Sequence, residues 1–168
     1  ANPREIAYFD RGPVDPDHLI LGGYWSVYYY NGKIYGSEIA RGLDVLALEP
    51  SADLTANEIA AAALADQGQT FNPQQQYPVS WPADPVVALA YVDQLQRGSD
   101  DPMLEQLASA LNAASSALSA GAPDAALAQR LEAMAGKLAS PATTDPLSQK
   151  RQTALKDSVK AIAARLRS

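Results

Sequence analysis

The sequence predicts an α+β protein in which a short antiparallel β-meander precedes a C-terminal antiparallel helical bundle. Aromatic residues are concentrated in the first half, since of two Trp, two Phe and eight Tyr only Tyr91 lies beyond Trp81. Residues 1–82 carry 4 Lys or Arg against 10 Asp or Glu, whereas residues 83–168 carry 9 of each. Three Asp-Pro pairs, a combination typical of helix starts, divide the second half. Two structural regimes therefore share the chain.

The meander is built around Asn31-Gly32, a pair that tolerates positive φ at both centres of a tight hairpin turn. Runs rich in aromatic and β-branched residues precede and follow it, which predicts strands at Tyr24–Tyr30 and Lys33–Ile39. Alternation of apolar residues predicts a third strand at Leu43–Leu48. A short additional strand is expected at Glu5–Phe9.

Strict alternation sorts the first strand into two faces. One face would carry Tyr24, Ser26, Tyr28 and Tyr30, and the other Trp25, Val27 and Tyr29. We expect one face to be core. The other is either a platform on which a ligand such as a sugar ring stacks or a surface covered by the helices.

A short helix and a linker connect the two regimes. Thr55 and Glu58 form the spacing of a capping box, which predicts a helix to about Asp66 with Gly68 as its stop. Residues 67–82 are rich in Gln, Pro and Asn and lack helical periodicity, which is typical of a linker. Within it, Trp81 is expected to be buried as an anchor.

Four helices are expected in the second regime, at about residues 85–97, 102–119, 123–139 and 146–167. Asp84, Asp101 and Asp145 are the expected N-caps, whereas Ala122-Pro123 offers a poorer start. Gly98 and Gly121 are placed where helices end in a left-handed residue. The expected core positions are Leu104, Leu107, Leu111, Leu118, Leu127, Leu131, Met134, Leu138, Leu155, Val159, Ile162 and Leu166.

The first 66 residues contain short sequence motifs that resemble those of a known family. These are Tyr8-Phe9-Asp10-Arg11-Gly12-Pro13, Leu21-Gly22-Gly23-Tyr24-Trp25-Ser26, Tyr30-Asn31-Gly32 and the run from Tyr35 to Val45. They resemble the closing blade of LVIVD-repeat proteins, which are secreted bacterial proteins of β-propeller-like architecture without a well-established activity. The resemblance implies a blade-like sheet at residues 1–66, followed by the linker and then the bundle at residues 83–168.

The same resemblance implies that the chain is the C-terminal part of a longer protein, because a propeller needs at least about four blades. It also implies a secreted or cell-envelope location.

Cysteine is absent, which excludes disulfides and thiolate metal sites. The net charge of −6 argues against nucleic-acid binding, and no apolar run is long enough to cross a bilayer.

Glu38, Arg41 and Asp44 form the most informative polar set. We expect both carboxylates to pair with the Arg41 guanidinium at the turn between the last two strands. Two interpretations remain open: a cluster that orients a ligand, or an ion-paired turn that fixes the register of the strands. Tyr24, Trp25 and Tyr28 complete the candidate ligand-binding residues, as aromatic side chains suited to stacking.

No catalytic, cofactor or metal site is predicted. His18 is the only histidine, and neither Ser26 nor Ser37 stands in a nucleophile motif. Asp15 and Asp17 lack the spacing and turn glycine of a calcium loop.

The expected function is therefore non-catalytic binding or scaffolding, with the ligand unknown. The expected partners are upstream propeller blades of the same polypeptide and a second copy that pairs through exposed strand edges. One alternative is the C-terminal part of a hydrolase-like propeller enzyme whose catalytic residues lie mostly upstream. Another is a dimerisation or docking module formed by the helices, whose last member is rich in Lys and Arg.

Overall fold

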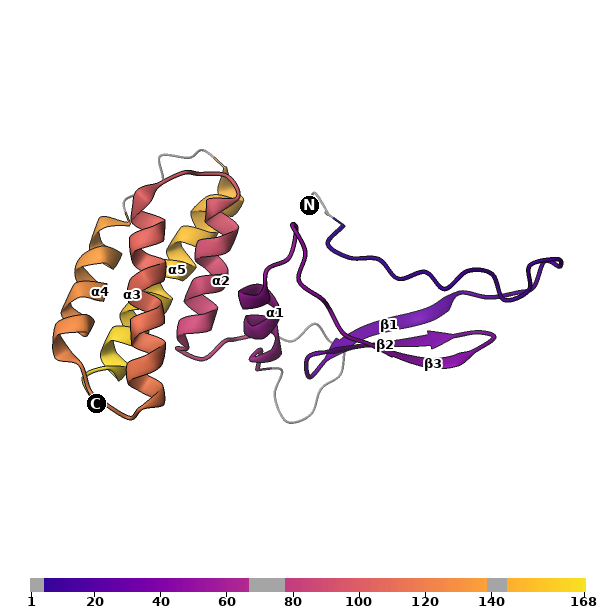
Figure 1. The fold of residues 1–168 in the computed structure, drawn as a ribbon, viewed down its shortest axis with the longest axis horizontal. Helices are drawn as coiled ribbons and strands as arrows, with labels where there is room; N and C mark the ends of the chain where they lie inside the picture. The colour runs from indigo at the N-terminus through magenta and orange to yellow at the C-terminus, as the bar shows by residue number, and fades with distance from the viewer. Residues whose placement is uncertain (1–4, 67–77, 139–144) are drawn as a thin grey trace. The chain divides into compact units, whose positions relative to one another are not determined.

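The computed structural model describes residues 5–66, 78–138 and 145–168 and divides the chain into two compact units, Ala1–Ser80 and Trp81–Ser168. The first unit contains a three-stranded sheet and one helix, and the second contains four helices (Figure 1). This arrangement confirms the α+β class and the order of sheet before bundle.

The sheet has the predicted meander topology. Strands β1 (Tyr24–Tyr30), β2 (Lys33–Glu38) and β3 (Gly42–Leu46) pair antiparallel in the order β1-β2-β3. Asn31 and Gly32 have φ of 49° and 75°, as the tight turn between β1 and β2 requires. Both outer edges of the sheet, on β1 and on β3, lack a partner strand among the described residues.

A bulge near the start of β1 changes which side chains share a face. Tyr24 is opposite Glu38 and Ser26 is opposite Ser37, so β1 advances two residues where β2 advances one. Tyr24 therefore lies on the same face as Glu38, whereas Tyr28 lies on the opposite face with Tyr35. The predicted grouping of Tyr24 with Tyr28 is wrong, because strict alternation cannot anticipate the inserted residue.

Neither face of the sheet is a hydrophobic core. Only Gly36 and Glu38 are buried in the strands, and the other described strand residues are half-buried or exposed. The expectation that one face would be core is wrong. Glu5–Phe9, expected as a strand, pairs with no described residue in a ladder and is irregular in conformation. The sheet gains little from burial of apolar area.

Helix α1 (Ala56–Ala63) starts with the predicted capping box. The Thr55 hydroxyl accepts from the Glu58 amide at 3.2 Å, and the Glu58 carboxylate accepts from the Thr55 amide at 2.8 Å. The expected stop at Gly68 and most of the linker lie outside the described residues. Trp81, at the end of the linker, is 44% exposed, so its expected burial is wrong.

The second unit is a bundle of α2 (Pro85–Gln96), α3 (Pro102–Ser119), α4 (Ala125–Lys137) and α5 (Pro146–Arg165). Asp84, Asp101 and Asp145 cap their helices as predicted. Helix α4 instead starts at Asp124, whose carboxylate accepts from the Leu127 amide at 2.8 Å. The sequence analysis does not predict this cap, because it places the start of the helix at Pro123.

The ends of α2 and α3 differ from one another. Gly121 has φ of 62°, the left-handed conformation predicted for it. Gly98 is not among the glycines with positive φ, so α2 ends without the predicted left-handed residue.

The helices of the bundle pack in a closed arrangement, in which α2 contacts α3 and α5, and α4 contacts α3 and α5. The Asp124 amide donates to the Leu166 carbonyl at 2.8 Å, which joins the start of α4 to the end of α5, as antiparallel packing requires. The predicted apolar stripes are buried, except that Leu118 and Leu138 are only partly buried. Among the described helices, none combines the length and the apolar composition that a membrane span requires.

The bundle offers a matched pair of leucines for testing its core. Leu107 is completely buried in α3, whereas Leu147 on α5 is 52% exposed. We expect Leu107→Ala to lower the free energy of unfolding by about 2–5 kcal/mol, because it removes packed atoms and leaves a cavity. Leu147→Ala should change it by less than about 0.5 kcal/mol. Urea denaturation followed by the helical circular dichroism signal measures both; equal effects would contradict the assigned core.

Candidate functional site

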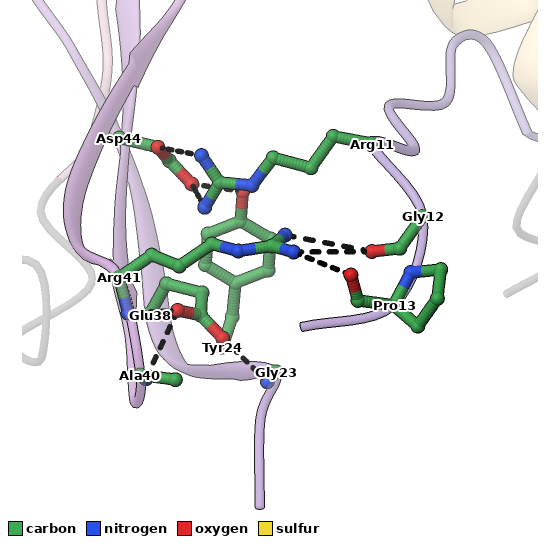
Figure 2. A network of polar contacts seen from close by, with 9 residues as sticks. All are labelled: Arg11, Gly12, Pro13, Gly23, Tyr24, Glu38, Ala40, Arg41 and Asp44. Atoms are coloured by element: carbon green, nitrogen blue, oxygen red, sulfur yellow. Dashed lines mark hydrogen bonds and ion pairs between the residues drawn. The ribbon is translucent and has the colours of Figure 1, made fainter. Parts of the chain in front are cut away.

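Most of the candidate residues lie at one end of the sheet, where β1 begins, β2 ends and β3 begins. Figure 2 shows Tyr24, Glu38, Arg41 and Asp44 gathered there, with Asp44 and Arg41 bonded to the loop at Arg11–Pro13. The loop comes from a part of the chain that precedes the sheet. The site therefore connects segments that are far apart in the sequence.

Glu38 organises the backbone at this end of the sheet. Its side chain is 7% exposed, the only charged residue that is buried in the described parts of the chain. The carboxylate accepts hydrogen bonds from the amides of Gly23 at 2.8 Å and Ala40 at 3.0 Å, and from the Arg41 amide. These bonds hold the pKa of Glu38 below its usual value of 4.5, and the bond from Gly23 has the largest effect. Glu38 therefore acts as a cap for three backbone donors.

Asp44 holds the ion pair of the network. The Arg11 guanidinium donates to both carboxylate oxygens, at 2.9 and 2.7 Å, in the bidentate geometry typical of arginine and carboxylate. The Tyr24 hydroxyl donates to Oδ2 at 2.6 Å. The bond from Tyr24, followed by the contact with Arg11, lowers the pKa of Asp44, and the same bond raises the pKa of the Tyr24 phenol.

Arg41 does not pair with either carboxylate as the sequence predicts. Its guanidinium donates to the Pro13 carbonyl at 2.7 Å and, at 3.4 and 3.5 Å, to the Gly12 carbonyl (Figure 2). The Glu38 carboxylate accepts from backbone amides, and the Asp44 carboxylate accepts from Arg11. The prediction therefore gave the right residues but the wrong partners. Arg11 carries no local signal for this role, because 33 positions separate it from Asp44.

Gly36 makes room for Tyr24. A Cβ built at Gly36 would lie 2.5 Å from Cε1 and 2.7 Å from Cδ1 of Tyr24, so the tyrosine ring occupies the space beside this glycine. This close approach lets a side chain on β1 reach Asp44 on β3 across the intervening strand. An isolated glycine inside a strand is the sequence signal that was available for it.

A cavity of about 620 Å³ adjoins the network, in the size range of ligand pockets. Residues 9–20 of the loop form most of its wall, and Gly22, Gly23, Tyr24, Glu38 and Arg41 form the rest. His18 lies in this wall with its side chain 77% exposed and its Nδ1 at 3.3 Å from Asp15. Ser26 and Ser37, the serines considered as nucleophiles, face each other in the β-ladder.

The contacts of the network shift the pKa values of three of its side chains. Lowered pKa values keep Glu38 and Asp44 ionised at neutral pH, so neither is a proton donor there. A raised pKa keeps the Tyr24 phenol protonated, so it is not a nucleophile. No group of His, Cys, Asp and Glu residues suited to a metal ion occurs among the described residues.

The remaining two candidates lie apart from the network. Trp25 is the extra residue at the bulge of β1 and is 74% exposed. Tyr28 lies on the opposite face of the sheet and is 37% exposed. The six predicted ligand-binding residues therefore divide into one polar cluster and two separate aromatic side chains.

Comparison of the chain with protein-family models, with curated proteins and with solved structures finds no match.

Lowering the pH should release the loop from the sheet. A carboxylate whose folded pKa lies below its ordinary value contributes stability above that value and loses it as the pH falls through the folded pKa. For Asp44 the ordinary value is 3.8, so we expect the Arg11 contact to persist from neutral pH to about pH 4 and to be lost below it. The carboxyl ¹³C shift of Asp44 and the near-ultraviolet signal of Tyr24 should change together.

The pKa of Glu38 is lowered as well, so acid protonates both carboxylates. Two variants distinguish their contributions. Asp44→Asn should abolish the acid transition of the Tyr24 signal, whereas Glu38→Gln should leave it in place. An unchanged transition in Asp44→Asn would contradict the assignment.

Substitution of two glycines should have opposite effects. Gly36→Ala forces the Tyr24 ring to move and should destabilise the sheet by about 1–3 kcal/mol. Gly136→Ala, in α4 with no atom within 4 Å of the added Cβ, should stabilise the bundle by about 0.5–1 kcal/mol. Thermal unfolding, followed by near-ultraviolet signals for the sheet and helical signals for the bundle, distinguishes them. A neutral Gly36→Ala would disprove the close contact.

Proposed function

We propose that the chain is a non-catalytic binding or scaffolding part of a secreted or cell-envelope LVIVD-repeat protein, and that its sheet packs against further β-structure. The observation that carries the proposal is the exposure of apolar side chains on the face opposite Glu38. We call this surface the Tyr28 face and define it as Tyr28, Tyr30, Tyr35, Leu43 and Val45.

The Tyr28 face is too apolar to suit permanent contact with water. Leu43 is 67% exposed and Val45 is 54% exposed, and Tyr28 and Tyr30 are also exposed, whereas Tyr35 is half-buried. Full burial of one such aliphatic side chain is worth about 1.5–3 kcal/mol, so covering the face would add stability that this sheet lacks. A contiguous apolar patch of this kind marks an interaction surface.

A second β-sheet is the partner that this surface fits best. Sheets pack face to face at about 10 Å with their side chains interdigitating, and Lys33 is the only charged residue among the strand residues on the Tyr28 face. Upstream blades of the same polypeptide would supply such a sheet, as the LVIVD resemblance implies. A second copy of the chain that pairs through the open strand edges is the alternative source.

The bundle has less need of a partner. Among the described residues of the second unit, Trp81 and Leu147 are the large apolar residues with high exposure, and the apolar stripes of the four helices are turned to a common core. This contrast favours the sheet over the helices as the binding part. The carboxylates of Glu38 and Asp44 are already bonded to amides, to Arg11 and to Tyr24, which supports a non-catalytic role.

Photo-cross-linking in the native host tests the proposed surface. A photoreactive phenylalanine derivative replaces Leu43 on the Tyr28 face or, as a matched exposed control, Leu147 on α5. We expect the probe at Leu43 to cross-link to a β-rich segment and the probe at Leu147 to yield little product. Equal labelling at both positions, or none at Leu43, would contradict the proposal.

The location is tested by recovering the protein separately from the culture medium and from the cytosol of the same host. We expect a species in the medium that is much heavier than 17.8 kDa. A species of about 17.8 kDa that is found only in the cytosol would refute the secreted LVIVD assignment. The cross-linking result would still decide whether the Tyr28 face is a contact surface.

A further inference from the structure

The end of the sheet that carries Asp44 has the geometry of a receptor for an arginine side chain. The Asp44 carboxylate accepts two hydrogen bonds from the Arg11 guanidinium, at 2.9 and 2.7 Å. The Tyr24 hydroxyl donates to Oδ2 at 2.6 Å and so fixes the orientation of the carboxylate. The Asp44 side chain is 13% exposed, against 33% for that of Arg11. A planar guanidinium complements this carboxylate, whereas the ammonium of a lysine cannot form the same two parallel bonds.

Arg41 contacts the main chain that follows the bound arginine. Its guanidinium donates to the Pro13 carbonyl at 2.7 Å and to the Gly12 carbonyl at 3.4 and 3.5 Å (Figure 2). Asp44 and Arg41 together therefore bind one arginine side chain and the carbonyl groups of the next two residues. The recognised unit is a short peptide and not an isolated charge.

The bound segment, residues 10–13, has a defined conformation. Gly12 has φ of 76°, which glycine adopts without steric cost, and its amide donates to Oδ1 of Asp10 at 2.7 Å. In Figure 2 this segment presents the Arg11 side chain and the carbonyls of Gly12 and Pro13 to the same end of the sheet. We call residues 10–13 the arginine turn.

The receptor is built on strands, whereas the arginine turn is not. Tyr24 belongs to β1 and Asp44 to β3, and the Tyr24 ring is seated beside Gly36 on β2. Residues 5–23 form no helix or strand, and large apolar side chains among them are exposed, such as Phe9 at 51% and Leu21 at 74%. Polar bonds, and not burial of apolar area, therefore attach the arginine turn to the sheet. Another polypeptide could supply the same bonds without disturbing a core.

Space for such a polypeptide adjoins the contact. The cavity of about 620 Å³ has Arg11 and Arg41 in its wall, together with Tyr24. The arginine turn belongs to the wall that residues 9–20 form, so its departure opens the cavity beside Arg41.

We propose that this end of the sheet is a peptide-binding site for an arginine turn, and that residues 10–13 occupy it within the same chain. Asp44 binds the guanidinium, and Arg41 binds the carbonyls of the two residues that follow. A partner polypeptide that presents arginine, glycine and proline in this conformation competes with the chain's own segment. The inference does not depend on the LVIVD assignment or on the Tyr28 face, which lies on the opposite side of the sheet.

Competition within the chain sets the expected affinities. Residues 14–23 connect the arginine turn to β1, and a short connection gives an effective concentration in the millimolar range. The affinity for an external turn falls in proportion to the fraction of chains in which the site is vacant. Removal of the Arg11 guanidinium should therefore raise this affinity, and removal of the Asp44 charge should abolish it.

Binding of a labelled synthetic peptide tests the proposal. The probe has the sequence of residues 8–14, and the matched control peptide carries lysine in place of its arginine. We expect Arg11→Ala to bind the arginine peptide at least about tenfold more tightly than the wild-type chain does, and at least about tenfold more tightly than it binds the lysine peptide. Arg11→Ala combined with Asp44→Asn should bind neither. Equal affinity for the two peptides, or binding that survives Asp44→Asn, would overturn the proposal.

The wild-type chain provides a measurement that does not require a variant to fold. At about 10 mM, above the effective concentration of the tethered turn, the arginine peptide should displace residues 10–13. The amide resonance of Gly12 in the isotopically labelled chain should then shift, whereas the lysine peptide should leave it in place. A Gly12 signal that responds to neither peptide would refute the exchange.

Mixing two variants distinguishes the sources of the external turn. Arg11→Ala keeps the Asp44 carboxylate, and Asp44→Asn keeps the arginine turn. A heterodimer of the two in light scattering would support the proposal with a second copy of this chain as the partner. Monomers in the mixture, together with binding of the arginine peptide, would support it with a different polypeptide as the partner.

Discussion

The carboxylate of Asp44 is the point on which the first unit depends. It accepts from the Arg11 guanidinium and the Tyr24 hydroxyl, and so holds the preceding loop, the first strand and the third strand at one end of the sheet. Glu38 complements it by satisfying three amides where the chain turns. Because the strands bury almost no apolar side chains, these charge-assisted bonds stabilise the sheet in the way that a hydrophobic core does in other proteins.

The second unit is stabilised in the opposite way. Its interior is apolar, with Leu107, Leu131 and Ile162 completely buried. Its polar contacts include the Asp caps at the helix starts and an exposed bidentate pair between Arg167, after α5, and Glu132 on α4. One chain therefore combines a unit that satisfies its own apolar surface with a unit that does not. Exposed apolar area is therefore concentrated on the sheet and not on the bundle.

Local rules predicted the parts of the fold that depend on neighbouring residues. Asn31-Gly32 fixed the hairpin because its backbone preference needs no tertiary context, and the Asp-Pro pairs fixed three helix starts for the same reason. The candidate site was predicted only in part, since the pairing of Arg11 with Asp44 depends on a loop that returns over the sheet. The predictions of a buried Trp81 and of a strand at Glu5–Phe9 are wrong, because burial and pairing depend on surfaces that residue type does not specify.

The bulge at Trp25 has a consequence for how this strand tolerates insertion and deletion. Removing one residue from a regular strand turns every side chain on one side of the gap to the other face. Trp25 is the extra residue between two register pairs, so a chain without it would keep Tyr24 opposite Glu38 and Ser26 opposite Ser37. The ladder does not require this tryptophan. Retention or loss of Trp25 over evolutionary time would therefore be decided by what its exposed indole contacts, and not by the geometry of the sheet.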